Sequence, residues 1–161
     1  MLFYIIFITN LGGLCMRVVV QRVKYASVTI NGTVNGKINN GFLVLLGIQS
    51  TDSEQDVDYL VKKVTNLRIF SDKNDKMNLS LKDVNGELLI VSQFTLYANC
   101  KEGNRPSFIE AAKPDIAIPL YEYFVSECKK VIPVVETGIF GADMKVELLN
   151  DGPVTIIMDS K

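Results

Sequence analysis

Residues 41–48 (GFLVLLGI) form an unbroken apolar run in the first third of the chain. A short apolar run without alternating polar residues predicts a β-strand that is buried on both faces. Ser53 follows as a candidate helix N-cap, and Val57, Leu60, Val61, Val64 and Leu67 recur at helical spacing. This pattern predicts an amphipathic helix of about four turns. A buried strand that leads into such a helix favours an α/β fold.

Further strands are expected on both sides of this unit. Valine-rich strands are predicted at 17–24 and 26–30, and Asn31-Gly32 is a strong two-residue hairpin turn into a strand at 33–34. The other expected elements are a polar loop at 71–76, a hairpin turning at Asn85-Gly86, a strand at 87–91, a second helix starting at Pro114, and strands at 133–136, 144–149 and 154–158.

Together these elements predict one α/β domain in which two main helices cover a mixed sheet, and 161 residues suffice for one such core. We expect the domain to span residues 16–161. The apolar segment 1–15 is interpreted as an extension upstream of it. That segment is too short to span a bilayer, which needs ~20 residues, and it lacks the basic start of a signal peptide. No membrane association is expected.

Composition excludes several kinds of chemistry. The chain contains no histidine, which rules out Ser-His, Cys-His and His-metal sites built from this chain alone. Its three cysteines are far apart and show no CxxC spacing, so we expect reduced thiols in an intracellular protein and no zinc site. The net charge of −1 gives no general attraction to nucleic acid. A polyanion would need a local patch, for which the candidates are Lys101, Arg105, Lys113, Lys129 and Lys130.

Two short segments carry the polar groups of greatest interest. Residues 92–96 (SQFTL) follow an expected strand and combine hydroxyl, amide and aromatic groups, and residues 150–155 (NDGPVT) place Gly152-Pro153 directly before a strand. Taken singly, Ser92 and Thr95 are typical strand-end hydrogen-bonding residues. Gly152-Pro153 alone is typical of a turn that enters an edge strand.

In combination, these segments resemble the D-aminoacyl-tRNA deacylase family, and the resemblance extends from residue 16 to residue 161. It is carried by residues 16–23 (MRVVVQRV), 92–96 (SQFTL), 105–108 (RPSF) with Ala111-Ala112, 137–144 (TGIFGADM) and 150–155 (NDGPVT).

The resemblance implies a homodimeric, cytoplasmic enzyme that hydrolyses the ester between a D-amino acid and the 3′ end of tRNA. It implies mixed and antiparallel, partly barrel-like sheets under two helices, and no metal or organic cofactor. Glycine mischarged onto tRNA is an expected second substrate. Gly152-Pro153 would be a cis-proline motif that enters the partner subunit's active site, where its main-chain oxygens would exclude an L side chain.

The same resemblance assigns roles to residues of this chain. Backbone amides near Phe94-Thr95 would stabilise the oxyanion, and the terminal 2′-hydroxyl of the tRNA would assist the attacking water. Phe94 and Phe140 are candidates to stack on the terminal adenosine, with simple core packing as the alternative. Arg22 is expected to brace the Gly-Pro loop, with a solvated arginine at a strand edge as the alternative. The expected catalytic set is Ser92, Gln93, Phe94 and Thr95. The expected substrate-binding and chiral-gate set is Gly152, Pro153, Arg22, Phe140, Met144 and Ala112.

Three alternatives remain open at this point. Thr95 could act as a covalent nucleophile, although no base lies near it in the sequence. Cys100 could serve a thiol hydrolase, which would also lack a base. The third alternative is a non-catalytic, replication-associated nucleic-acid-binding protein on the same fold, in which a chiral gate would have no use.

Overall fold

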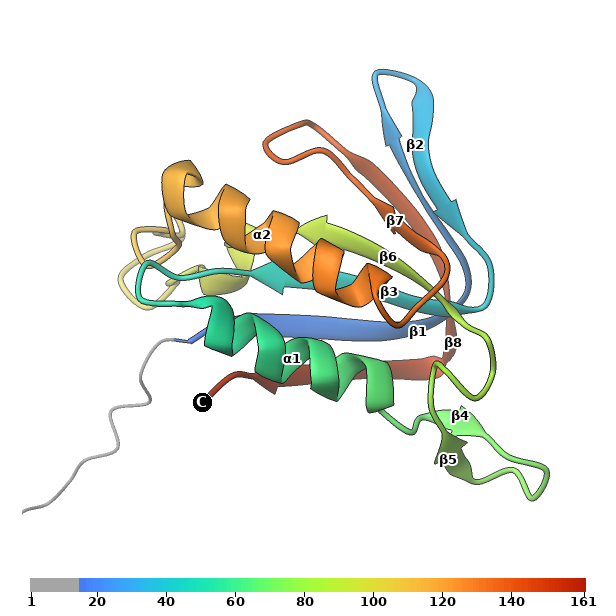
Figure 1. The fold of residues 1–161 in the computed structure, drawn as a ribbon. Helices are drawn as coiled ribbons and strands as arrows, with labels where there is room; N and C mark the ends of the chain where they lie inside the picture. Colours follow the sequence, from blue (N-terminus) through green and yellow to red (C-terminus); the bar gives the residue numbers. More distant parts are fainter. Residues whose placement is uncertain (1–14) are drawn as a thin grey trace, which may run out of the picture.

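The computed structural model describes residues 15–161, so the expected extension at 1–15 lies outside the described residues except for Cys15. Its main sheet has six strands in the order β2-β1-β3-β6-β7, and β8 pairs with β1. Figure 1 shows helices α1 and α2 side by side on one face of this sheet. The elements are β1 (Arg17–Ile30), β2 (Thr33–Ile38), β3 (Gly41–Gly47), α1 (Glu54–Asn66), β4 (Phe70–Ser71), β5 (Met77–Leu79), β6 (Glu87–Ser92), the 3-10 helix η1 (Phe94–Tyr97), α2 (Pro114–Lys129), β7 (Val135–Thr137) and β8 (Lys145–Asp159).

The centre of the sheet is parallel, as expected for strands joined through helices. β3 pairs in parallel with β6, and β6 pairs in parallel with β7. Six of the seven residues of β3 are buried, which confirms the strand predicted from its apolar run. One face packs against the helices through residues such as Phe42, Leu60 and Phe124. The opposite face packs Leu43 and Leu89 against a second apolar cluster.

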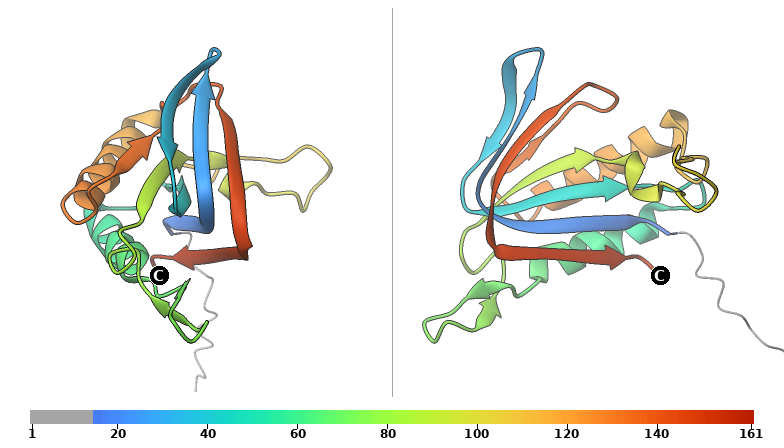
Figure 2. Two further views of the ribbon diagram at one scale, coloured as in Figure 1. Left: turned by 90° about the vertical axis from the view of Figure 1, so that its right-hand side faces the viewer. Right: turned by 180° about the vertical axis from the view of Figure 1, so that it is seen from behind.

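Two long bent strands give the sheet its curvature. β1 pairs with β3 over residues 17–23 and with β2 over residues 26–30, whereas β8 pairs with β1 along both halves. Figure 2 shows β1 and β8 bending together, so that β2 and one half of each strand curl over the face away from the helices. The mixed, partly barrel-like α/β architecture with two main helices is therefore confirmed.

In β1 and β8 the structure differs from the expected strand boundaries. The two strands predicted at 17–24 and 26–30 are one strand of 14 residues. Those predicted at 144–149 and 154–158 are one strand of 15 residues. β8 pairs with β1 on both sides of the bend, which keeps both strands extended through it. At Gly152-Pro153 the pairing skips from Thr155 to Asn150, and the register shifts on either side of Val23.

The predicted hairpin at Asn85-Gly86 is wrong. The antiparallel pair in this region is β4 with β5, which flanks residues 72–76. The Asp72 carboxylate closes that turn, because it accepts hydrogen bonds from the N–H groups of Asn74 at 2.8 Å and Lys76 at 3.1 Å. At Gly86 the N–H donates to the Leu81 carbonyl at 2.8 Å, and the chain then enters β6, whose partners are parallel.

Among residues 15–161, no helix has both the length and the apolar character needed to cross a membrane.

Candidate active site

The segment after β6 is held in place by contacts to β3 and to Cys15. The N–H of Gln93 donates to the Leu46 carbonyl at 2.8 Å, and the chain then forms η1. The Tyr97 hydroxyl lies 2.6 Å from the Cys15 carbonyl oxygen and 2.9 Å from that of Gly47. Burial raises the pKa of Tyr97, so its hydroxyl remains a neutral donor. These anchors fix the backbone of residues 93–97.

A pocket of about 550 Å³ opens beside this anchored segment. Three stretches of chain line it: the end of β6, the loop that precedes α2, and the loop between β7 and β8. Lys113 is the only ionisable residue in the lining. The structure therefore brings together these predicted site residues: Ser92, Gln93, Phe94, Ala112, Phe140 and Met144.

Aromatic rings form the walls of this pocket. Phe94 is 53% exposed, and its ring meets that of Phe108 edge-on with centroids 5.1 Å apart. Phe140 lies 6.3 Å from the Tyr121 ring, whose hydroxyl donates to the Ile90 carbonyl at 2.7 Å. Burial raises the pKa of Tyr121 to about 12, so it too stays neutral. Phe108 is a lining residue that was not singled out as a site residue, and its presence in the RPSF motif was the available signal.

The backbone N–H groups of Phe94 and Thr95, at the start of η1, are available to donate hydrogen bonds. The first N–H groups of a helical turn have no partner within that turn, and no acceptor is found for either group among the described residues. The Thr95 hydroxyl accepts a hydrogen bond from the Gln93 side-chain amide, and Thr95 itself is exposed and lies outside the pocket lining. An amide donor leaves that hydroxyl without a base. The segment is thus suited to stabilising negative charge through its amides.

Gly152-Pro153 lies on β8 and does not line this pocket. Both residues are exposed, and the peptide bond between them is cis, as the resemblance implies. Asn150 steadies the segment, since its side-chain amide donates to the Arg22 carbonyl at 3.1 Å and to the Val154 carbonyl at 2.9 Å.

Arg22 lies directly against this segment. The residue is 9% exposed, its Nε donates to the Asp151 carbonyl at 3.2 Å, and its Nη1 donates to the Ile69 carbonyl. A side chain on Gly152 would come within 3.1 Å of the Arg22 guanidinium. Arg22 thus holds the backbone just before Gly152-Pro153, on a different part of the subunit from the pocket.

The five basic residues proposed from the sequence do not form a single patch. Lys113 lines the pocket, whereas Lys129 ends α2, which at ~1.5 Å per residue places the two about 24 Å apart. Lys130 forms an ion pair with Glu127 at 2.5 Å.

Cys100 is exposed and does not line the pocket. Within residues 15–161 there is no group of three or more acidic, cysteine or histidine side chains arranged to hold a metal ion.

Comparison with known proteins places these features in one family. A family model described as D-Tyr-tRNA(Tyr) deacylase matches residues 19–159. The chain is 60% identical over 147 residues to a D-aminoacyl-tRNA deacylase of Flavobacterium psychrophilum, covering 91% of this chain and 98% of that one. It is 62% identical over 146 residues to the protein of the same name in Fusobacterium nucleatum, covering 91% and 97%.

Two solved structures share the fold. One is described as the c-Myc DNA Unwinding Element Binding Protein, with a TM-score of 0.85, 40% identity, and coverage of 90% of this chain and 99% of that one. The other is described as a probable eukaryotic D-amino acid tRNA deacylase, with a TM-score of 0.79, 18% identity, and coverage of 91% and 100%. The family match and the 60% identity to a named relative agree with the pocket motifs. The chain therefore belongs to the D-Tyr-tRNA(Tyr) deacylase family.

Proposed function

We propose that this protein hydrolyses the ester bond between a D-amino acid and the 3′ end of tRNA, as a proofreading enzyme of the cytoplasm. The observation that carries this proposal is the pocket in which Ser92, Gln93 and Phe94 meet Phe140 and Met144. The names of the relatives support the substrate class.

The proposed chemistry needs little beyond positioning. An aminoacyl ester is already activated, so its hydrolysis depends on an oriented water and on donors for the tetrahedral oxyanion. The free N–H groups of Phe94 and Thr95 are suitable donors, because the chain that carries them is anchored at Gln93 and Tyr97. The ribose 2′-hydroxyl of the substrate would orient the water.

The aromatic walls suit the terminal adenosine of tRNA. An unpaired base stacks on aromatic rings, and Phe94 and Phe140 both face the pocket. Met144 and Ala112 supply apolar contacts around the same space. This arrangement would leave the ester carbonyl beside the backbone of Phe94 and Thr95.

We further propose that chirality is read by Gly152-Pro153 of the partner subunit in a homodimer. These residues are exposed and held by Arg22, and they lie outside their own subunit's pocket. A gate made of main-chain oxygens would reject an L side chain by clash while a D side chain points outward. Glycine has no side chain to reject, so glycyl-tRNA would also be hydrolysed.

A direct assay tests this function. Purified protein is incubated with D-tyrosyl-tRNA, L-tyrosyl-tRNA and glycyl-tRNA, with and without excess EDTA, and ester loss is followed. We expect hydrolysis of the D and glycyl esters, with EDTA having no effect. A metal-dependent enzyme would lose activity with EDTA and regain it on addition of zinc. Equal rates on the D and L esters would contradict the chiral gate.

A second candidate is a non-catalytic DNA-binding protein. It is favoured by the similarity to the 40% identical solved structure, which is described as a DNA unwinding element binding protein. The assay separates the two candidates, because a protein of that kind would leave all three esters intact while binding duplex or single-stranded DNA.

An active enzyme that runs as a dimer on a calibrated size-exclusion column, and loses activity on dilution to monomer, would support the proposed assembly.

A further inference from the structure

A groove lined by basic residues lies where α1 ends and the chain continues toward β4. It encloses about 600 Å³ and is lined by Tyr59, Lys62, Lys63, Asn66, Leu67 and Arg68. None of these residues is acidic. We refer to this set of six residues as the basic groove.

The segment that carries the basic groove has an excess of positive charge, although Asp83 lies close to it. Hydrogen bonds from Ser80 lower the pKa of Asp83, and the charges of Arg68 and Lys82 lower it further. Residues 62–82 contain six cationic side chains and two carboxylates, a net charge of +4 in a chain whose overall charge is −1. None of the six cations takes part in an ion pair within the described part of the chain. Asp72 is engaged in closing the β4–β5 turn, and Asp83, just beyond the segment, accepts hydrogen bonds from Ser80. The segment therefore keeps a net positive charge that can attract a polyanion.

The basic groove is arranged to suit phosphate. The guanidinium of Arg68 is oriented by Asn78, to whose carbonyl its Nε donates at 2.8 Å and to whose side-chain oxygen its Nη2 also donates. The remaining N–H groups of Arg68 stay free, and such a planar fork matches phosphate oxygens. The Lys63 ammonium lies 5.6 Å from the centre of the Tyr59 ring, and no hydrogen bond is found for the Lys62 ammonium among residues 15–161.

Arg22 connects this groove to Gly152-Pro153. Its Nη1 donates to the carbonyl of Ile69, which directly follows Arg68, and its Nε donates to the carbonyl of Asp151. Figures 1 and 2 show the β4–β5 hairpin at the opposite end of the molecule from the loop that precedes α2. The basic groove thus lies beside its own subunit's Gly-Pro segment and far from its own subunit's pocket.

We infer that the basic groove of one subunit binds the phosphate backbone of the tRNA whose 3′ end occupies the partner subunit's pocket. The inference rests on the proposed cross-subunit gate, because a Gly-Pro segment that enters the partner's pocket brings the groove to that pocket's surroundings. Phosphate contacts of this kind position RNA without reading its sequence. Each tRNA would then be held by both subunits.

The first test compares a long and a short substrate. Lys62→Gln/Lys63→Gln is the test variant, and Lys37→Gln, which removes another exposed lysine without an ion pair, is the control. We expect the double variant to raise KM for D-tyrosyl-tRNA by roughly 10-fold at unchanged kcat, and to flatten the dependence of KM on salt. The D-tyrosyl ester of the trinucleotide CCA, which is too short to reach the groove, should be hydrolysed as by the wild-type protein.

The second test asks which subunit supplies the groove. Mixed dimers are purified with two tags, and Ala112→Trp blocks the pocket of one subunit. When the double lysine variant is in the subunit with the blocked pocket, KM for D-tyrosyl-tRNA should rise. When it is in the subunit with the open pocket, KM should equal that of the wild type. Arg68→Gln should repeat this pattern.

The outcomes separate the two proposals. A wild-type protein that hydrolyses neither the tRNA ester nor the CCA ester would overturn the proposed function itself. Active wild-type protein combined with unchanged KM in the lysine variant would overturn the groove assignment alone. So would an equal loss on the CCA ester, or a rise in KM that follows the subunit with the open pocket.

Discussion

The Nε of Arg22 donates a hydrogen bond to the main-chain oxygen of Asp151 at 3.2 Å, between residues 129 positions apart in the sequence. The same guanidinium reaches the carbonyl of Ile69, so one buried side chain joins β1, β8 and the residue that precedes β4. The carboxylate of Asp151 adds an ion pair with Arg22 at 3.5 Å. The backbone before Gly152-Pro153 is therefore held by a group that reaches across strands.

Replacing Arg22 tests whether this contact matters for selectivity. Arg22→Lys keeps the charge but loses the fork that bonds both carbonyls. We expect kcat/KM for D-tyrosyl-tRNA to fall roughly 10-fold, which corresponds to the loss of about one hydrogen bond, and L-tyrosyl-tRNA to become a better substrate relative to it. Arg17→Lys is the matched control, because Arg17 is also on β1 but pairs with Asp159 at 2.7 Å. If both variants behave alike, Arg22 does not position the gate.

Thr95→Ala tests the nucleophile alternative. The Thr95 hydroxyl accepts a hydrogen bond from the Gln93 amide and has no base beside it, so we expect the alanine variant to keep kcat within about threefold of the wild type. A covalent mechanism predicts the opposite, a loss of activity in the alanine variant, because it requires an acyl-enzyme on Thr95. Mass spectrometry of the quenched reaction would detect that species, and its presence would contradict the role of the backbone amides.

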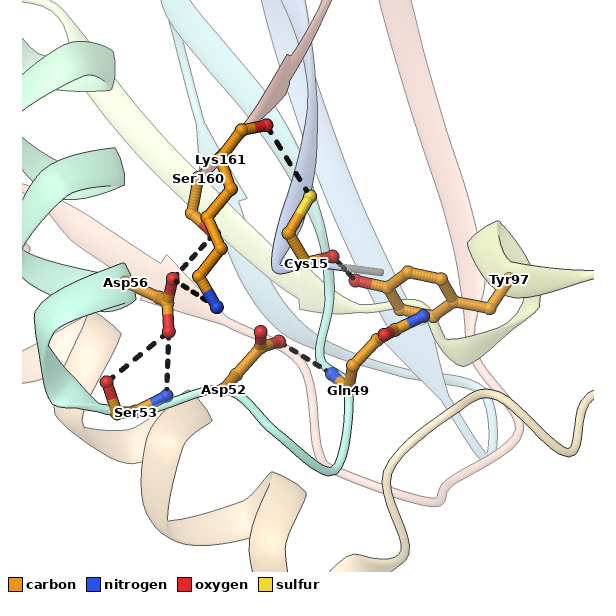
Figure 3. A network of polar contacts seen from close by, with 8 residues as sticks. All are labelled: Cys15, Gln49, Asp52, Ser53, Asp56, Tyr97, Ser160 and Lys161. Atoms are coloured by element: carbon orange, nitrogen blue, oxygen red, sulfur yellow. Dashed lines mark hydrogen bonds and ion pairs between the residues drawn. The ribbon is translucent and has the colours of Figure 1, made fainter. Parts of the chain in front are cut away.

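Asp56 ties the start of α1 to the C-terminal residues, as Figure 3 shows. Its carboxylate accepts hydrogen bonds from the Ser160 hydroxyl at 2.7 Å and the Ser53 N–H at 2.9 Å, and it lies 3.7 Å from the Lys161 ammonium. Burial acts to raise the pKa of Asp56, but the hydrogen bonds and the lysine outweigh it, so the pKa lies below its ordinary value. The ionised carboxylate therefore favours the folded state.

The pH dependence of unfolding tests whether the ionised Asp56 carboxylate stabilises the folded state. Because the pKa of Asp56 is lower in the folded protein than in the unfolded chain, the ionised carboxylate stabilises the fold at pH values above its unfolded pKa of ~3.9. That stabilisation is lost as the pH falls through the pKa of the folded protein. We expect Asp56→Asn to lower the free energy of unfolding by about 1–2 kcal/mol at pH 7, with the difference from wild type shrinking below pH ~4. Urea titrations across this range measure it. Asp115→Asn, in the exposed first turn of α2, should change far less.

The cysteines offer a test that is independent of tRNA. Cys100 is exposed, whereas Cys15 and Cys128 are buried, and burial raises the pKa of Cys128 to about 12. A maleimide should therefore label one thiol in the native protein and all three after unfolding. Hydrolysis of D-tyrosyl-tRNA should survive the native labelling, because Cys100 does not line the pocket. Loss of activity in proportion to labelling would instead support the alternative in which Cys100 is the nucleophile of a thiol hydrolase.

Local chemistry was enough to predict several elements from the sequence. Asn31-Gly32 forms the expected turn with φ values of 49° and 78°, the left-handed conformation that a two-residue hairpin needs. Ser53 is the N-cap of α1, and Pro114 begins α2. The Asn85-Gly86 prediction failed although Asn85 has a positive φ of 50°. A turn dipeptide specifies a change of direction, but whether strands pair across it depends on distant segments, here β3 and β7.

The sequence by itself determined which groups are available for chemistry, because composition and motif are local properties. It excluded catalytic and metal sites that depend on histidine, predicted the strand that delivers Ser92, and placed Gly152-Pro153 directly before a strand. Only the tertiary structure decided that Phe94, Ala112 and Phe140 share one pocket, since three separate stretches of the chain meet there. It also decided that Arg22 bonds both Asp151 and Ile69. Contacts between segments so far apart in the chain depend on how the whole sheet packs, which no local pattern of residues records.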